Sequence, residues 1–144
     1  MGSTENILQI GLLIVLLLGS GFFSASETSL MSLSKIRIRY MEEEGVKGAK
    51  LVSSLIEKSS DLLSSILVGN NVVNIAATSV STSLFISIFG DGGVAIATAV
   101  MTVLVLIFGE ITPKTIAANS PEKIAVIVSK PISIIMKITK PIVW

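Results

Sequence analysis

The sequence predicts an all-α integral membrane protein, with three transmembrane helices per protomer, short helices on the cytosolic side and a kinked juxtamembrane amphipathic helix. Three observations predict this fold class. Hydrophobic residues make up 51% of the 144 residues and charged residues only 15%. The mean hydropathy of +0.83 is far above that of a soluble domain. Three long apolar segments follow one another, at about 7–33, 62–89 and 93–112, in a single domain that covers 1–144.

The composition also excludes several classes of function. The chain has no Cys and no His, so it cannot hold a disulfide, a zinc site of the usual kind or a nucleophile activated by histidine. Any metal must therefore be bound by oxygen atoms. The net charge of +1 gives no sign of nucleic-acid binding. No pair of a nucleophile and a base is visible, and an enzyme is not expected.

The first span, about 7–33, has two different halves. Up to Leu18 it is almost entirely Leu, Ile and Val, and after Gly19 it becomes rich in Gly and Ser. Ser20, Ser24 and Glu27 recur at helical spacing, so they share one face that must be turned away from lipid. This face is either a set of ligands or a small-residue surface for close helix packing. We expect the helix to continue to about residue 44.

The second span is preceded by a water-facing segment and carries three asparagines. The segment 34–61 has mixed charge and predicts a short amphipathic helix at about 46–58, followed by a helix-capping signal at 59–61. In the span itself, Asn70 and Asn74 lie on one face and Asn71 on another. Amides in a membrane can bind a ligand, or they can hold helices together by hydrogen bonds.

The third span, about 93–112, follows a glycine-rich turn and ends at a carboxylate. Glu110 stands at the end of a run without charged residues, and a carboxylate at membrane depth is a functional-site hypothesis by default. Pro113 has no N–H to donate to the Gly109 carbonyl, which predicts a free backbone oxygen at a break in the helix. The alternative is a helix that ends at the proline with Glu110 paired to Lys114.

The last hydrophobic stretch, about 120–143, is expected to be an interfacial helix. Lys123, Lys130 and Lys137 recur every seven residues and so mark one face, and Pro131 should kink the helix. Lysines are concentrated in this tail and in the segment 34–61, whereas the turn at 90–93 has none. By the positive-inside rule, the N-terminus lies outside and the C-terminus in the cytoplasm. A fourth span would bury three lysines and is less favourable.

The polar groups of the three spans should meet between the bilayer centre and its inner half, given about 1.5 Å per helical residue. Hydroxyl, amide, carbonyl and carboxylate oxygens supply six hard ligands, the number that Mg²⁺ demands. One carboxylate alone would balance Na⁺ better, with Glu27 as a candidate second anion, so the sequence leaves the identity of the ion open. The candidate ligands are Ser20, Ser24, Asn70, Asn74, Gly109 and Glu110.

Three motifs in this order resemble the transmembrane domain of the CorC/CNNM (cyclin M) family of magnesium transporters. They are Gly21-Phe22-Phe23-Ser24-Ala25-Ser26-Glu27-Thr28, Gly69-Asn70 with Asn74, and Phe108-Gly109-Glu110-Ile111-Thr112-Pro113-Lys114. The resemblance implies a homodimer in the plasma (inner) membrane that exports Mg²⁺, driven by Na⁺ entry. It also implies that the Mg²⁺ ligands are the same six residues, Ser20, Ser24, Asn70, Asn74, Gly109 and Glu110.

Members of that family continue into cytosolic CBS domains that bind ATP, followed by a further small domain. The 144 residues contain neither, so no nucleotide is expected to bind this chain. The competing hypothesis is a membrane anchor and dimerisation module, whose polar stripes only hold helices together and whose function lies in such cytosolic domains.

Overall fold

The structure is a computed structural model that describes the backbone of residues 3–143 and the side chains of residues 4–139. All of its elements are helical within this part of the chain. In order, they are α1 (Ser3–Ser32), α2 (Lys35–Glu43), α3 (Ala49–Glu57), α4 (Ser59–Phe89), the 3-10 helix η1 (Gly90–Gly92), α5 (Gly93–Leu104), the π-helix η2 (Val105–Ile111), α6 (Thr112–Asn119) and α7 (Pro121–Val143).

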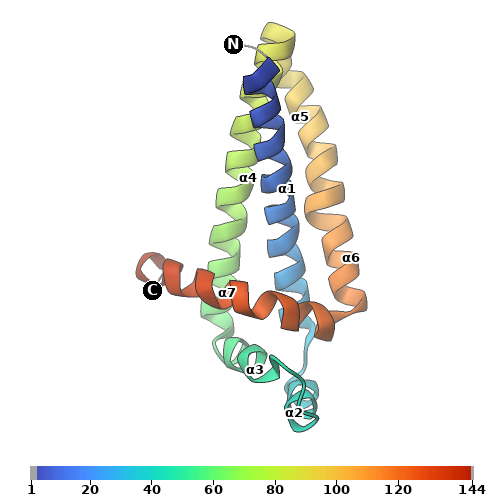
Figure 1. Cartoon of the computed structure of the whole chain (residues 1–144), viewed down its shortest axis with the longest axis vertical. Helices are drawn as coiled ribbons and strands as arrows, with labels where there is room; N and C mark the ends of the chain where they lie inside the picture. Colours follow the sequence, from blue (N-terminus) through green and yellow to red (C-terminus); the bar gives the residue numbers. More distant parts are fainter. Residues whose placement is uncertain (1–2, 144) are drawn as a thin grey trace.

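Three long helical rods stand side by side: α1, α4 and the continuous rod from α5 to α6 (Figure 1). Two stretches are long and apolar enough to cross a membrane, Thr4–Ser32 and the 61 residues Ser59–Asn119. The second stretch folds back on itself at η1, where Gly90 adopts a positive φ of 72°. It therefore consists of two antiparallel arms, and the glycine-rich turn expected before the third apolar segment is the turn of this hairpin.

The prediction that the first helix continues to about residue 44 is wrong. The helix ends at Ser32, and Ser34 has extended backbone angles (φ −82°, ψ 157°). The Ser34 hydroxyl accepts a hydrogen bond of 3.1 Å from the Arg37 N–H and so caps α2. Serine is among the residues that cap helices best, because its oxygen satisfies an N–H that the first turn leaves free. The chain thus turns at this point, and α2 lies beneath the rods (Figure 1).

The capping signal predicted at 59–61 is also wrong, because α4 already begins at Ser59 and its cap position is Lys58, which makes no side-chain cap hydrogen bond. The short amphipathic helix predicted at 46–58 is confirmed in position by α3. Its Val52 and Leu55 are buried. They join one core with the C-terminal end of α1, the N-terminal end of α4 and one face of α7, built around Leu30, Leu62 and other apolar side chains.

The amphipathic character of α7 is confirmed. Its buried residues Ala125, Val128, Ile132 and Met136 follow helical spacing, while the three lysines at 123, 130 and 137 are exposed. The helix crosses the three rods near one end, as Figure 1 shows. It runs through Pro131 without interruption; the kink and the position along the inner leaflet stay predictions.

Two polar contacts tie α7 to the rest of the molecule. Ser65 and Thr139 form a buried hydroxyl pair at 2.8 Å between α4 and α7. At the other end of α7, Arg37 Nε donates to Glu122 Oε2 at 2.6 Å, in an exposed ion pair. The hydrogen bond and the charge of Glu122 both raise the pKa of the Arg37 guanidinium. The orientation of α7 across the rods is therefore fixed from both sides by packing and by hydrogen bonds.

Candidate metal centre

Two serines of α1 lie in the interior where α1, α4 and η2 meet. Ser20 is 1% exposed and Ser24 is 2% exposed. The Ser20 hydroxyl faces Asn70 Oδ1 of α4 at 3.5 Å, and the Ser24 hydroxyl donates to the Gly109 carbonyl of η2 at 2.5 Å. The polar face predicted for α1 is therefore turned inward, with one serine directed at each neighbouring helix.

The asparagines of α4 complete this cluster. Asn74 Nδ2 donates to Asn70 Oδ1 at 3.5 Å, so that both contacts of Asn70 Oδ1 are at the outer limit of hydrogen-bond length. Asn74 Oδ1 is buried and has no hydrogen-bond partner. A buried acceptor without a partner is costly and calls for an explanation such as a bound ion or water. Asn71 is exposed and takes no part.

The backbone of η2 comes unusually close to α1. A Cβ atom added to Gly109 would lie 2.8 Å from Ser20 Oγ. A Cβ atom added to Gly21 would lie 2.9 Å from the Phe108 carbonyl oxygen and 3.0 Å from Pro113 Cγ. The distances of 2.8 and 2.9 Å are shorter than real Cβ contacts allow. Glycine at these two positions therefore lets α1 and η2 approach closely enough for the Ser24 hydroxyl to reach the Gly109 carbonyl.

The prediction that the helix breaks at Pro113 is wrong, since the rod continues through α6 to Asn119. Instead, the backbone widens into the π-helix η2, a feature that occurs frequently at functional sites. The Thr112 N–H bonds to the Ile107 carbonyl, five residues back, and so bypasses the carbonyl of Phe108. Pro113 has no N–H. The Phe108 carbonyl consequently receives neither an α-helical nor a π-helical hydrogen bond, and Gly109 lacks its α-helical donor.

Glu110 follows Gly109 in the chain and so lies beside this cluster, but its carboxylate pairs with Lys114. Glu110 Oε2 lies 4.0 Å from Lys114 Nζ, and the two side chains are 38% and 46% exposed. This is the pairing that the alternative reading of the sequence expected. Glu27 is half-buried. Among the described residues, no three acidic side chains converge, so the cluster is made mainly of neutral oxygens.

The structure therefore brings five of the six predicted ligands together. The sixth, Glu110, is the next residue after Gly109 in the chain. Sequence reasoning missed the π-helix and the Phe108 carbonyl that it leaves without an α-helical or π-helical donor. The available signal was Pro113 together with Gly109, four residues before it, because that pair removes one hydrogen bond and one side chain from the same turn. The close approach of Gly21 could not be predicted, since it depends on how α1 packs against η2.

The fold and the buried oxygen cluster define a helical membrane protein with a polar centre between its rods. The chain belongs to the cyclin M family: the profile of the cyclin M transmembrane N-terminal domain matches residues 11–144. The resemblance stated from the three motifs is thereby confirmed.

Relatives come from bacteria and plants. A UPF0053 protein of Haemophilus influenzae is 47% identical over 133 residues, which are 92% of this chain and 32% of the relative. The UPF0053 inner membrane protein YfjD of Escherichia coli is 45% identical over 125 residues, 87% of this chain and 29% of that protein. A chloroplastic DUF21 domain-containing protein of Arabidopsis thaliana is 38% identical over 96% of this chain and 22% of its own length. The chain thus spans about a third or less of these relatives.

Proposed function

We propose that this chain is the membrane domain of a magnesium transporter, in which Mg²⁺ is the cargo and passes through the oxygen cluster between α1, α4 and η2. The observation that carries the proposal is the buried, unpartnered Asn74 Oδ1. It lies in a cluster whose other polar groups also carry oxygen atoms that could bind a metal ion. The ligands would be Ser20, Ser24, Asn70, Asn74, Gly109 and Glu110.

The chemistry of these groups suits a hard cation. Mg²⁺ binds oxygen in octahedral geometry at about 2.0–2.1 Å, and hydroxyl, amide, carbonyl and carboxylate oxygens are all present. The contacts of Asn70 Oδ1 are long, at 3.5 Å, so the side chains of Ser20 and Asn74 can turn toward an ion without losing strong hydrogen bonds.

Glu110 would supply the only negative charge of the set. Its pair with Lys114 is long and more than a third exposed, and such pairs contribute about 0–1 kcal/mol. Releasing the carboxylate toward a cation therefore costs little. A single carboxylate leaves a divalent ion half neutralised, so retained water or Glu27 would complete the balance.

The membrane arrangement belongs to the same proposal. The rods α1, α4 and α5 to α6 would be three spans, with α7 along the inner leaflet and its lysines at the lipid phosphates. The N-terminus would be outside and the C-terminus in the cytoplasm, because the basic residues gather on the side of α2, α3 and α7. The membrane would be the plasma membrane of a cell or the inner membrane of a bacterium; the relative YfjD carries "inner membrane protein" in its name.

Assembly and energy coupling extend the proposal further. Three spans are too few to enclose a pathway and open it alternately to both sides, so a homodimer is the expected unit. Export of Mg²⁺ against its gradient needs a driving ion, and Na⁺ entry is the coupling that the family resemblance implies.

A second candidate function is a membrane anchor and dimerisation module. It is favoured by the hydroxyls that donate to carbonyls of their own helices, as Ser26 does to Phe22, because such groups need no ligand. Under this reading, the polar cluster stabilises packing only.

Ion flux separates the two. The chain is reconstituted into liposomes with a fluorescent Mg²⁺ indicator, and an outward or inward Na⁺ gradient is imposed. We expect Mg²⁺ flux that Glu110→Ala and Asn74→Ala abolish and that the matched control Asn71→Ala retains, since Asn71 is exposed and lies outside the cluster. Flux that is absent from the wild-type chain, or equal in all three variants, would favour the anchor.

A further inference from the structure

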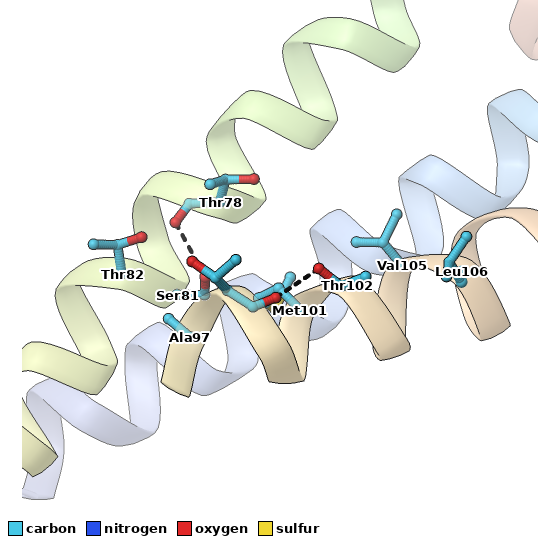
Figure 2. A pocket seen from close by; sticks show the side chains of 9 residues that line it. Thr78, Ser81, Thr82, Ala97, Met101, Thr102, Val105 and Leu106 are labelled. Carbon is cyan, nitrogen blue, oxygen red and sulfur yellow. Dashed lines mark hydrogen bonds between the residues drawn. The ribbon is translucent and has the colours of Figure 1, made fainter. Parts of the chain in front are cut away.

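A groove of about 340 Å³ lies between α4 and α5, outside the metal centre. Figure 2 shows side chains from both helices on its walls. Its polar lining consists of hydroxyls alone. They belong to Thr78, Ser81 and Thr82 on α4 and to Thr98 and Thr102 on α5.

Four of the five hydroxyls in this lining, all but that of Thr82, already donate their protons to backbone carbonyls. Thr78 Oγ1 donates to the Asn74 carbonyl at 2.9 Å, and Ser81 Oγ donates to the Thr78 carbonyl at 3.0 Å. On α5, Thr98 Oγ1 donates to the Val94 carbonyl at 2.9 Å and Thr102 Oγ1 to the Thr98 carbonyl at 2.6 Å.

A hydroxyl oxygen that donates its proton keeps its two lone pairs. The groove therefore offers hydrogen-bond acceptors, with no charged side chain and no amide N–H group of a side chain in its lining. Acceptors of this kind suit cations and their bound water, and the Thr82 hydroxyl is the one group of the lining left to donate a hydrogen bond to an anion.

The groove begins where the metal centre ends. Thr78 bonds to the backbone carbonyl of Asn74, whose side chain carries the unpartnered buried oxygen. On the opposite wall, Val105 and Leu106 are the first residues of η2. The far end of the groove, at Ala97, lies toward the turn that joins α4 to α5.

We propose that this groove is a water-filled cation vestibule that connects the metal centre with the membrane face at η1, the outer face in the orientation proposed above. Its role in transport rests on the proposed function, whereas its preference for cations rests on its own lining. The volume is sufficient for a cation with six bound waters, which need about 180 Å³ at about 30 Å³ per water.

Cysteine accessibility tests the vestibule, and the absence of Cys from the sequence gives a clean background. The variant Thr102→Cys places a thiol in the groove. The control Val103→Cys places one on the next residue of α5, which is 54% exposed but is no part of the groove lining. Both are reconstituted as the full chain in liposomes and treated with a cationic and an anionic methanethiosulfonate, with rates normalised to those of a free thiol in solution.

We expect the cationic reagent to modify Thr102→Cys at least tenfold faster than it modifies Val103→Cys. We also expect the normalised rate at Thr102→Cys to be at least tenfold higher for the cationic reagent than for the anionic reagent. Equal rates for the two variants would overturn the vestibule, and equal normalised rates for the two reagents would overturn its cation preference. Rapid disulfide dimerisation of Thr102→Cys under mild oxidation would show that a second copy covers the groove, which would also overturn it. Thr98→Cys repeats the measurement if Thr102→Cys does not fold.

The same labelling in a Glu110→Ala background separates this inference from the proposed function. Glu110 is no part of the groove lining, so its removal should leave the labelling rates unchanged. Retained labelling together with wild-type Mg²⁺ flux in Glu110→Ala would contradict the role of Glu110 in transport and leave the vestibule intact.

Discussion

The substitution Gly21→Ala should separate α1 from η2 and thereby disturb the metal centre. The added Cβ would lie 2.9 Å from the Phe108 carbonyl oxygen and 3.0 Å from Pro113 Cγ. Neither atom can rotate away, because one is backbone and the other belongs to a rigid ring. Overpacking of this kind costs about 1–3 kcal/mol, and the rigid partners place Gly21→Ala near the upper end. The higher helix propensity of alanine returns about 1 kcal/mol, which leaves a net loss of about 2 kcal/mol.

The same helix supplies a matched control. A Cβ added to Gly19 would meet only Val73 methyl groups, at 3.5 and 3.7 Å, which is ordinary van der Waals contact. Gly19→Ala should therefore be neutral or more stable by up to about 1 kcal/mol. Unfolding in mixed detergent micelles, followed by circular dichroism, gives the free energy of unfolding of both variants. Equal stabilities for Gly21→Ala and Gly19→Ala would refute the close approach of α1 to η2.

Three further changes test other contacts. In Gly109→Ala, the new Cβ would lie 2.8 Å from Ser20 Oγ; a hydroxyl can rotate away cheaply, so we expect Mg²⁺ affinity measured by titration calorimetry to fall at least tenfold while the melting temperature changes little. A double-mutant cycle of Ser65→Ala and Thr139→Val should give a coupling free energy of about 0.6 to 1.7 kcal/mol, because their hydroxyls pair at 2.8 Å between α4 and α7; zero coupling would contradict that contact. Leu30→Ala should lower the free energy of unfolding by about 2–5 kcal/mol, since Leu30 is 1% exposed in the main core; a loss below about 1 kcal/mol would mean that this core is not packed as described.

The sequence predicted the long helices well, because their signal is local. Uninterrupted apolar runs and helical spacing mark α1, α4, α5 and α7, and the exposed lysines of α7 sit on the face that their heptad spacing indicated. The errors fall where competing local signals had to be weighed. Ser34 was one of several serines near the end of the first span, and only the turn of the chain shows that it caps α2.

The candidate centre was predicted at the level of residues and not of geometry. Ser20, Ser24, Asn70 and Asn74 could be assigned to inward faces because polar side chains avoid lipid. Pro113 does remove the α-helical donor to the Gly109 carbonyl, but that oxygen is not free, because it accepts a hydrogen bond from the Ser24 hydroxyl. The sequence also could not show that the helix would widen into a π-helix instead of breaking, since both responses remove the same hydrogen bond. The pairing of Glu110 with Lys114 depends on side-chain rotamers that spacing alone does not determine.

The central claim is that Mg²⁺ binds at the buried oxygens between the rods, and thermal stability of the purified chain tests it most directly. Unfolding is followed against graded MgCl₂, with NaCl and CaCl₂ at matched ionic strength, for the wild type, Asn74→Ala and the control Asn71→Ala. A ligand at 100 times its Kd stabilises the folded state by about 2.7 kcal/mol.

The account predicts that Mg²⁺ stabilises the wild type and Asn71→Ala by about this amount, that Na⁺ and Ca²⁺ stabilise them less, and that Asn74→Ala loses the response. Stabilisation that is absent, or that is the same for all ions and all variants, would contradict it.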